Sequence, residues 1–360
     1  MPVTLRVFLL IAGLSSISST ALSQTGTAGA AAGASSALNA DVNFRKRELE
    51  KNPMNAEARA QLAVALERKK DYQGMIDLLA DYKDKIGRSG LILLARAFGK
   101  VGRQVEEITT LELANARYAK DASLQTLLAA ATARIGRHEQ AIEIYYKAKE
   151  YNPKYIPAYD GLIAELIKTE SRQEARDLIS DMMKKFGAKP RWVSELCNLY
   201  VLDAFHEKSV ETCTRAMKVD SSNPMNAVHL GRAYTEQGEA DKAKNVLIKT
   251  AMKIRKSEPV QSALGAYFME KKNFIDAFRW YKAGVKNDPK SYQAQLGLAQ
   301  SALELQKMEE SLGAFIAACK INRTASREFQ SGLIRIRNRN DSKWKIRFEE
   351  AISNHCQLGM

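Results

Sequence analysis

Cysteine, proline and glycine are all scarce in this chain of 360 residues. Four cysteines are too few for a small fold held together mainly by disulfides. The 20 glycines and 8 prolines make up about 8% of the chain, against about 12% in average proteins, so turn-forming residues are few and a mostly helical chain is indicated. Apolar residues are 45% and charged residues 27% of the total. This composition excludes a collagen-like chain, a disordered chain and a multi-span membrane protein.

The N-terminus has the three regions of a signal peptide in their usual order. Arg6 precedes an apolar run over residues 7–14, a Ser/Thr-rich stretch follows, and small residues stand just before Gln24. We therefore predict a signal peptide over 1–23 and a mature chain that begins at Gln24, with a buried core helix as the alternative. The apolar run is too short to span a bilayer alone. The absence of a cysteine near the cleavage site argues against a lipid-anchored lipoprotein.

Residues 24–40 read QTGTAGAAAGASSALNA, with no charge and almost no bulky apolar side chain. Such a stretch buries too little surface to offset the entropy lost on ordering, so it is predicted to be a flexible linker. An Ala-rich helix is the alternative, which Gly26, Gly29 and Gly33 would weaken. The folded body is then 41–360. Its formal charge is +13, because Arg6 is the only charged residue removed from a chain of charge +14.

A leucine recurs at a nearly constant interval along the folded body. A first interval of 32 residues is followed by six of 34, at Leu62, Leu94, Leu128, Leu162, Leu196, Leu230, Leu264 and Leu298. A mostly small residue follows each of these leucines directly. Later in several repeats an alanine precedes a larger side chain by four residues, as in Ala141 and Tyr145, which places both on one helix face. Repeats of this length predict pairs of antiparallel helices that stack on one another.

These residues resemble the tetratricopeptide repeat (TPR) family, whose pattern is W-x2-L-G-x2-Y…A-x3-F…P. The nearest matches are Ala227-x2-Leu230-Gly231-x2-Tyr234 and Gln261-x2-Leu264-Gly265-x2-Phe268. The likeness covers roughly 53–323, and the repeats begin near Ala56, Arg88, Ala122, Ile156, Pro190, Pro224, Glu258 and Tyr292. The second repeat departs from the pattern at Glu107, where a small residue should close the helix pair. The resemblance implies an all-α, right-handed solenoid of about eight helix pairs.

Helical caps are expected at both ends of the array. Residues 41–51 have helical composition and would cover the first repeat. Beyond the last repeat, Asp341 can act as an N-cap, and apolar residues recur at helical spacing at Phe329, Leu333, Ile336, Trp344, Phe348, Ala351 and Ile352. We therefore assign 41–323 to the TPR array with its N-terminal helix and 324–360 to divergent capping helices. A β-hairpin, built on the alternating residues around 335–345, is the competing interpretation.

No catalytic pattern is found in the sequence. The four histidines lie in different repeats, and none has a second histidine or a cysteine at the spacing of a metal site. Glycine-rich phosphate loops and the G-x-S-x-G motif are also missing. Because the repeats take up nearly the whole chain, we expect a protein without enzymatic activity, cofactor or metal.

By resemblance, the first helix of each repeat lines a groove in which TPR proteins bind partner segments. The predicted wall consists of Ile92, Arg96, Thr126, Ala130, Asp160, Ala164, Ser194, Asn198, Val228, Arg232, Ser262, Ala266, Leu296 and Gln300. Chaperone-binding members clamp a C-terminal carboxylate with Lys and Asn one helical turn apart. Here Asn198 follows Ser194, so that clamp is absent. The small, neutral residues in the middle of the wall would let an extended segment or a helix lie close.

Cys197 and Cys213 lie in one repeat, eight residues before and after a turn near Phe205. Antiparallel packing puts them level, within reach of a disulfide. Two buried thiols acting as small apolar residues are the alternative. Cys319 and Cys356 are weaker candidates for a bond, because the docking of the cap does not follow from the sequence.

Together these features predict an exported scaffold or adaptor of the cell envelope, in a periplasm, that binds a protein or peptide in its groove. A secreted protein and a eukaryotic secretory pathway are the alternatives for location. Residues 321–360 hold eight Lys or Arg and four Asp or Glu. This excess leaves a second function open, namely binding of an anionic envelope polymer (peptidoglycan or polysaccharide) through a basic surface. Export argues against nucleic acid as the partner.

Overall fold

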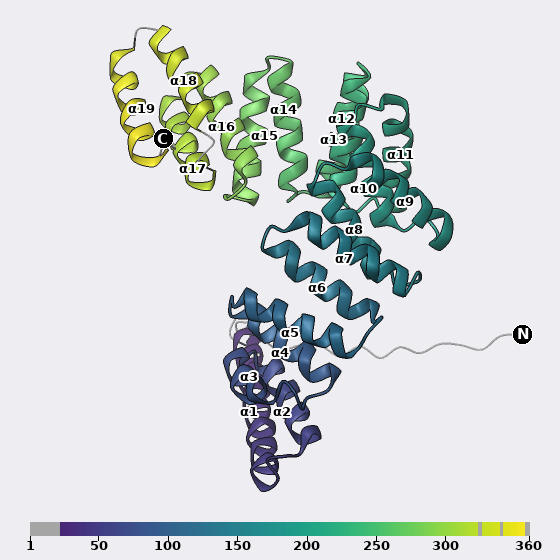
Figure 1. Cartoon of the computed structure of the whole chain (residues 1–360). Coiled ribbons are helices and arrows are strands. Elements are labelled where there is room, and N and C mark those ends of the chain that lie inside the picture. The colour runs from purple at the N-terminus through teal and green to yellow at the C-terminus, as the bar shows by residue number, and fades with distance from the viewer. Residues whose placement is uncertain (1–21, 323–325, 339–340, 357–360) are drawn as a thin grey trace, which may run out of the picture. The chain divides into compact units, whose positions relative to one another are not determined.

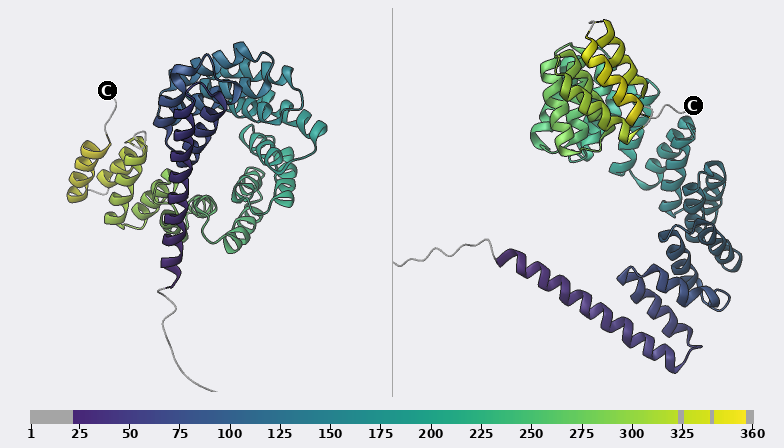
Figure 2. Two further views of the ribbon diagram at one scale, coloured as in Figure 1. Left: turned by 90° about the horizontal axis from the view of Figure 1, so that it is seen from below. Right: turned by 90° about the vertical axis from the view of Figure 1, so that its left-hand side faces the viewer.

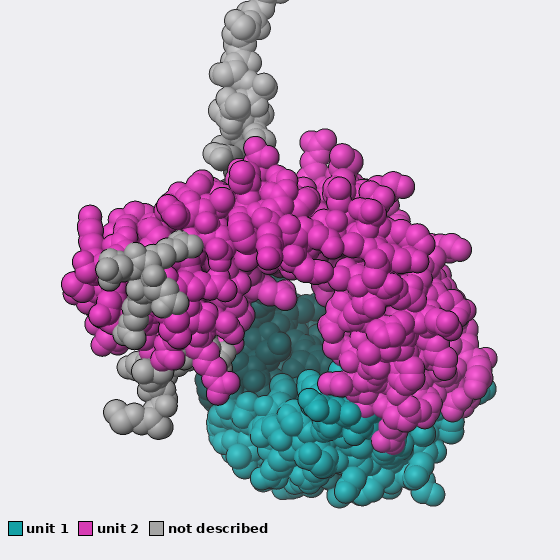
Figure 3. Space-filling model, turned by 90° about the horizontal axis from the view of Figure 1, so that it is seen from above, with its two compact units in different colours: residues 1–171 teal, residues 172–360 magenta. Residues whose placement is uncertain are grey.

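The computed structural model describes residues 22–322, 326–338 and 341–356, and every regular element in these ranges is a helix (Figure 1). Residues 1–21, which hold nearly all of the predicted signal peptide, lie outside the described residues. None of the described helices combines the length and the apolar character that crossing a bilayer requires. The chain divides into two compact units, residues 1–171 and 172–360 (Figure 3).

Each unit is a stack of short antiparallel helices. Unit 1 contains α1 (Leu22–Lys51), α2 (Ala56–Lys69), α3 (Tyr72–Leu79) with a short 3-10 turn (Ala80–Tyr82), α4 (Arg88–Lys100), α5 (Gln104–Arg117), α6 (Ala122–Arg134), α7 (His138–Tyr151) and α8 (Ile156–Lys168). Unit 2 contains α9 (Arg172–Phe186), α10 (Pro190–Leu202), α11 (His206–Val219), α12 (Pro224–Glu236), α13 (Ala240–Lys253), α14 (Glu258–Glu270), α15 (Phe274–Asn287), α16 (Tyr292–Glu304), α17 (Met308–Ile321), α18 (Ser326–Asn338) and α19 (Ser342–His355).

The helices follow the register of the repeating leucines. The eight predicted repeat starts coincide with the first residues of α2, α4, α6, α8, α10, α12, α14 and α16. All eight leucines are buried. The turn between the two helices of a repeat holds a left-handed residue, with positive φ at Lys70, Gly102, Gly136, Glu170, Ala204, Gly238, Lys272 and Gln306. This conformation favours glycine, which explains why glycine occurs at three of these turns.

Large side chains of one helix fill the space left by glycines of its neighbours. Tyr281 on α15 is buried, and burial raises the pKa of its hydroxyl to about 12. A Cβ atom added to Gly297 on α16 would lie 2.1 Å from the Tyr281 ring, and one added to Gly265 on α14 would lie 2.8 Å from it. The helices can approach this closely only because neither residue has a side chain.

The structure corrects the expectation of a flexible linker at 24–40, because α1 is one long helix from Leu22 to Lys51 (Figure 2). Its C-terminal part packs on α2, where Val42 is buried and the Arg45 guanidinium donates a hydrogen bond of 2.7 Å to Gln61. Once this part is helical, each residue added before it gains one backbone hydrogen bond. Alanine, the commonest residue there, has the highest helix propensity.

The C-terminal cap consists of two helices, α18 and α19, and the alternative of a β-hairpin is wrong. The Asp341 carboxylate accepts a hydrogen bond of 3.3 Å from the Trp344 backbone N–H, so Asp341 caps α19. Phe329 and Phe348 are fully buried against Phe315 of α17, with ring centroids 4.8 to 6.1 Å apart. This aromatic cluster closes the apolar end of the stack in unit 2.

All four cysteines are paired in buried disulfides. Cys197 of α10 is bonded to Cys213 of α11, with the Cα atoms 4.8 Å apart. Cys319 of α17 is bonded to Cys356, which directly follows α19, with the Cα atoms 5.3 Å apart. The first bond is the pair that the sequence favours. The second joins the cap to the last repeat, a pairing that depends on a docking the sequence did not reveal.

The cap disulfide should carry a large share of the stability of unit 2. We expect the double variant Cys319→Ser/Cys356→Ser to lower the free energy of unfolding by about 2–5 kcal/mol, the usual cost of losing a native disulfide. Thermal unfolding of the full chain measures this loss. Mass spectrometry of unreduced peptides, from protein taken from its native compartment, should show both linked pairs. Free, alkylatable thiols at these positions would contradict the assignment.

Candidate functional site

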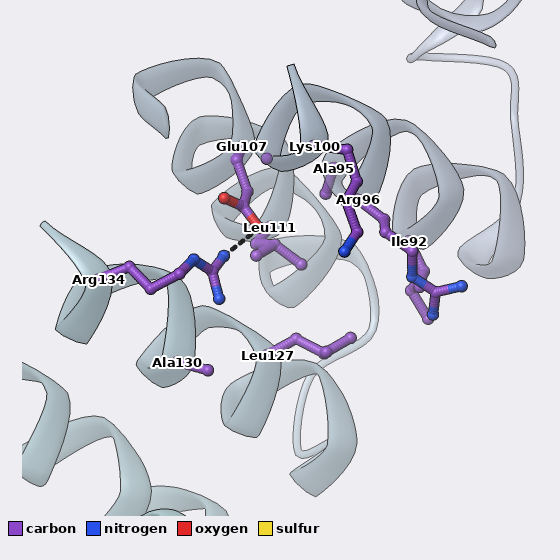
Figure 4. A pocket seen from close by; sticks show the side chains of 10 residues that line it. Ile92, Ala95, Arg96, Lys100, Glu107, Leu111, Leu127, Ala130 and Arg134 are labelled. Atoms are coloured by element: carbon purple, nitrogen blue, oxygen red, sulfur yellow. Dashed lines mark hydrogen bonds and ion pairs between the residues drawn. The ribbon is translucent and has the colours of Figure 1, made fainter. Parts of the chain in front are cut away.

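A pocket of about 420 Å³ opens between α4, α5 and α6 in unit 1 (Figure 4). Helices α4 and α6 are the first helices of two successive repeats, and α5 lies between them in sequence. The pocket is lined by Ile92, Ala95, Arg96, Gly99, Lys100, Glu107, Leu111, Leu127, Ala130 and Arg134. Its walls therefore combine aliphatic side chains with four charged residues.

At the pocket, α4 has an unusually small residue and α5 has an unusually large one. Glu107 of α5 stands where later repeats have a small residue such as Ala141, and it is only 7% exposed. Gly99 of α4 provides the room, since a Cβ atom there would lie 2.6 Å from the Glu107 carboxyl carbon. The equivalent residue of the next repeat is Ala133, and larger side chains stand there in the repeats that follow. The departure at Glu107 is thus compensated within the same helix pair.

The charges around the pocket are predominantly basic. Arg134 of α6 donates a hydrogen bond to the Glu107 carboxylate and forms an ion pair with it (Figure 4). Arg96 forms an ion pair with Glu67 of α2, outside the pocket. Lys100 is exposed and has no ion pair within the part of the chain that the structure describes. Three cations and one buried carboxylate therefore line the pocket, and the carboxylate is already paired with Arg134.

This arrangement suits a side chain of mixed character. Ile92, Leu111 and Leu127 offer an apolar surface to an inserted aliphatic or aromatic group. Lys100 stands on α4 beside it and would attract a carboxylate, whereas Arg96 would first have to leave its ion pair with Glu67. A ligand that fits both features has an apolar group with an acidic group next to it.

Three of the fourteen predicted groove residues meet in this pocket, namely Ile92, Arg96 and Ala130. The other eleven do not line it. In unit 1, Thr126 and Asp160 are half-buried and Ala164 is exposed. The Thr126 hydroxyl donates a hydrogen bond of 2.8 Å to the Ala122 carbonyl of its own helix, so it is turned towards α6 itself.

In unit 2 most of the predicted groove residues are half-buried or exposed, at Ser194, Asn198, Val228, Arg232, Ala266, Leu296 and Gln300. Arg232 forms an ion pair with Glu236 one turn along α12, with Nε 2.8 Å from the carboxylate. Ser262 is an exception because it is only 4% exposed. Its hydroxyl donates a hydrogen bond of 2.6 Å to the Glu258 carboxylate, so Ser262 does not form part of an open wall.

The histidines make local contacts. His138 Nδ1 lies 2.7 Å from the buried Glu165 carboxylate. Burial, with a smaller contribution from Arg232, lowers the pKa of His229 to about 4. Among the described residues, no group of three or more His, Cys, Asp or Glu side chains is placed to hold a metal ion.

Five of the pocket's residues were missed by the sequence analysis although they are decisive for its shape or charge: Gly99, Lys100, Leu111, Leu127 and Arg134. One signal was present in the sequence. The position of Glu107 broke the repeat pattern, and the unusually small Gly99 stood eight residues earlier, across the turn. A large residue on one helix matched by a small one on its partner indicates contact.

Two segments of the chain match family models described as tetratricopeptide repeat, residues 122–155 and 263–326. Among curated proteins, none matches the sequence. A tetratricopeptide repeat protein from Parabacteroides merdae has a similar fold, with a TM-score of 0.59 at 11% identity over 68% of this chain and 98% of that one. Residues 122–155 and 263–326 are therefore tetratricopeptide repeats, and the all-α stack of helix pairs in this chain is the fold of TPR proteins.

Other solved structures overlap less well. YrrB, described as a TPR protein with an unusual peptide-binding site, gives a TM-score of 0.40 at 17% identity over 51% of this chain and 95% of its own. MamA from Desulfovibrio magneticus RS-1 gives 0.42 at 19% identity over 45% of this chain and 92% of its own.

The ion pair inside the pocket should be needed for stability. We expect Arg134→Gln to lower the free energy of unfolding by about 1–3 kcal/mol, because it leaves the buried Glu107 carboxylate without its partner. The double variant Glu107→Gln/Arg134→Gln should regain part of this loss. Chemical denaturation followed by circular dichroism measures both. Arg137→Gln is the control, since it removes the same charge from an exposed residue nearby. If Arg134→Gln and Arg137→Gln changed the free energy of unfolding equally, the ion pair between Glu107 and Arg134 would contribute nothing to stability.

Proposed function

We propose that this protein is a non-catalytic scaffold of the cell envelope that holds a partner protein through the pocket between α4, α5 and α6. The observation that carries the proposal is the convergence of Ile92, Arg96 and Ala130 on one pocket. These residues come from the first helices of two successive repeats, where the resemblance to the TPR family places the partner. A pocket of this size takes one large side chain of a bound segment.

The bound segment is an extended or helical stretch of the partner that carries an apolar residue with an acidic residue beside it. The apolar side chain packs against Leu111 and Leu127, and the carboxylate lies near Lys100. Small side chains at Ala95 and Ala130 allow the backbone of the segment to come close to α4 and α6. Most of the affinity should then come from burial of the apolar side chain, while the cations select the acidic neighbour.

Export of the protein is part of this proposal and has two independent supports. The N-terminal residues have the order of a signal peptide, with Gln24 as the first residue of the mature chain. All four cysteines are paired in disulfides, which persist in oxidising compartments such as the periplasm and are rare in the cytosol. A periplasmic location satisfies both supports.

The proposal is tested by blocking the pocket in the full-length protein. Ala130→Arg places a long side chain in the wall of the pocket and should abolish capture of the partner from envelope extract. Ala116→Arg is the matched control, because Ala116 is an exposed alanine on α5 that does not line the pocket. It should capture the partner as the unchanged protein does.

Salt separates this mode of binding from capture of a polyanion. Binding through a buried apolar side chain should weaken only modestly when salt is raised, whereas binding through Lys and Arg alone should collapse. The proposal is wrong if Ala130→Arg captures the partner as well as Ala116→Arg does, or if added salt removes capture completely.

A further inference from the structure

Unit 2 carries most of the excess positive charge of the chain. Residues 172–360 hold 32 Lys or Arg and 22 Asp or Glu. The excess is concentrated between residues 242 and 290, which hold twelve basic and four acidic residues. These residues cover α13, α14 and α15 together with the loops that flank them.

Exposed cations gather where the second helix of one repeat passes to the first helix of the next. They lie at the ends of α11, α13 and α15 and in the following loops, at Lys218, Lys253, Arg255, Lys256, Lys286 and Lys290. We call these six residues and the loops that carry them the basic edge. All six are exposed.

Direct contacts join the three loops of the basic edge. The Lys253 ammonium at the end of α13 donates a hydrogen bond of 2.8 Å to the Ser221 hydroxyl in the loop before α12. The Ser291 hydroxyl in the loop before α16 donates one of 2.7 Å to the Glu258 carboxylate at the start of α14. The loops therefore form one continuous border of unit 2.

Exposed apolar side chains stand between these cations. Met252 is 72% exposed, Val219 is 42% exposed and Met225 is 38% exposed. Lys218, Met252 and Lys286 are spaced by 34 residues, so they occupy equivalent positions in three successive repeats. A methionine so open to water is largely unpacked within the described chain.

The charges are not explained by helix ends alone. A lysine in the last turn of a helix is favoured by the helix dipole, which accounts for Lys218, Lys253 and Lys286. Arg255, Lys256 and Lys290 lie in loops, beyond the last turn.

The acidic residues on the same border are engaged locally. Asp220 accepts hydrogen bonds from the backbone N–H groups of Ser222 and Asn223, Asp288 accepts one from that of Lys290, and Glu258 accepts hydroxyl hydrogen bonds.

We propose that the basic edge docks on the surface of an anionic lipid bilayer. Cations interleaved with exposed apolar side chains match the chemistry of that surface, where Lys and Arg meet anionic headgroups and apolar groups enter the boundary with the acyl chains. A soluble polyanion would use the cations and leave Met252 in water. This inference does not rest on the pocket of unit 1.

The test measures flotation of the full-length protein with vesicles. One set is phosphatidylcholine alone and the other contains about 30% phosphatidylglycerol. The measured quantity is the ratio of binding to the anionic and the neutral set. The N-terminal residues are the same in all variants, so a difference in binding between variants comes from the basic edge or from the control site.

Arg255→Glu/Lys256→Glu should lower the ratio by at least about ten-fold, since each basic side chain near an anionic leaflet contributes a factor of about five. The matched control is Lys271→Glu/Lys272→Glu, which makes the same charge change in the exposed turn between α14 and α15, at the opposite ends of these helices. It should bind as the unchanged protein does. Met252→Ser should weaken binding to the anionic vesicles about two- to five-fold, because it removes an inserted apolar group.

Three results would overturn the proposal. The first is equal binding of the unchanged protein to both vesicle sets. The second is an equal loss in the two double variants, which would show a response to net charge alone. The third is an unaltered Met252→Ser variant together with full competition by dextran sulfate, which would assign the edge to a soluble polyanion. All the substituted residues are exposed, so matching melting temperatures should exclude unfolding as the cause of a loss.

Discussion

Close approach of paired helices at a small residue is the contact on which the rest of this structure depends. Two helices of about fourteen residues bury too little surface to be stable alone, so each repeat relies on its neighbours. At the close contacts of the stack a small residue faces a larger side chain, as Gly265 and Gly297 face Tyr281. At Gly99 and Glu107 the sizes are exchanged, with the small residue on the first helix and the large one on the second. The two changes compensate each other, so the helix pair is retained.

The same register decides which residues remain open to a partner. Once the leucine of each first helix is buried, residues two positions before and after it tend to face away from the core. In the second and third repeats these residues include Ile92, Arg96 and Ala130, which line the pocket. The register also aligns the ends of the second helices, so that charged and apolar residues spaced by 34 positions form the basic edge of unit 2. Pocket and edge are therefore consequences of one periodic packing scheme.

Much of the fold could be predicted from the sequence because the same helix contacts recur in eight repeats, so that their residues return at a nearly constant spacing. The helix starts, the buried leucines, the capping stripe and the closeness of Cys197 to Cys213 all follow from local spacing. The bond between Cys319 and Cys356 depends on how α19 docks, which spacing does not reveal. The helix over 24–40 is an extension of the C-terminal part of α1, which packs on α2, and the sequence of 24–40 alone does not show this. Only three predicted groove residues meet in the pocket, since its shape comes from Gly99 and Glu107, where the repeat departs from its own pattern.

The proposed function requires that a partner contacts the first helices of unit 1 at the pocket. A photocrosslinking scan of the full-length protein in its native cells tests this most directly. A photoreactive amino acid is placed at Ile92, at Ala130 and, as a control, at Ala116 on α5. We predict a crosslinked partner at Ile92 and Ala130 and none at Ala116. Crosslinks at Ala116 without any at Ile92 or Ala130 would contradict it.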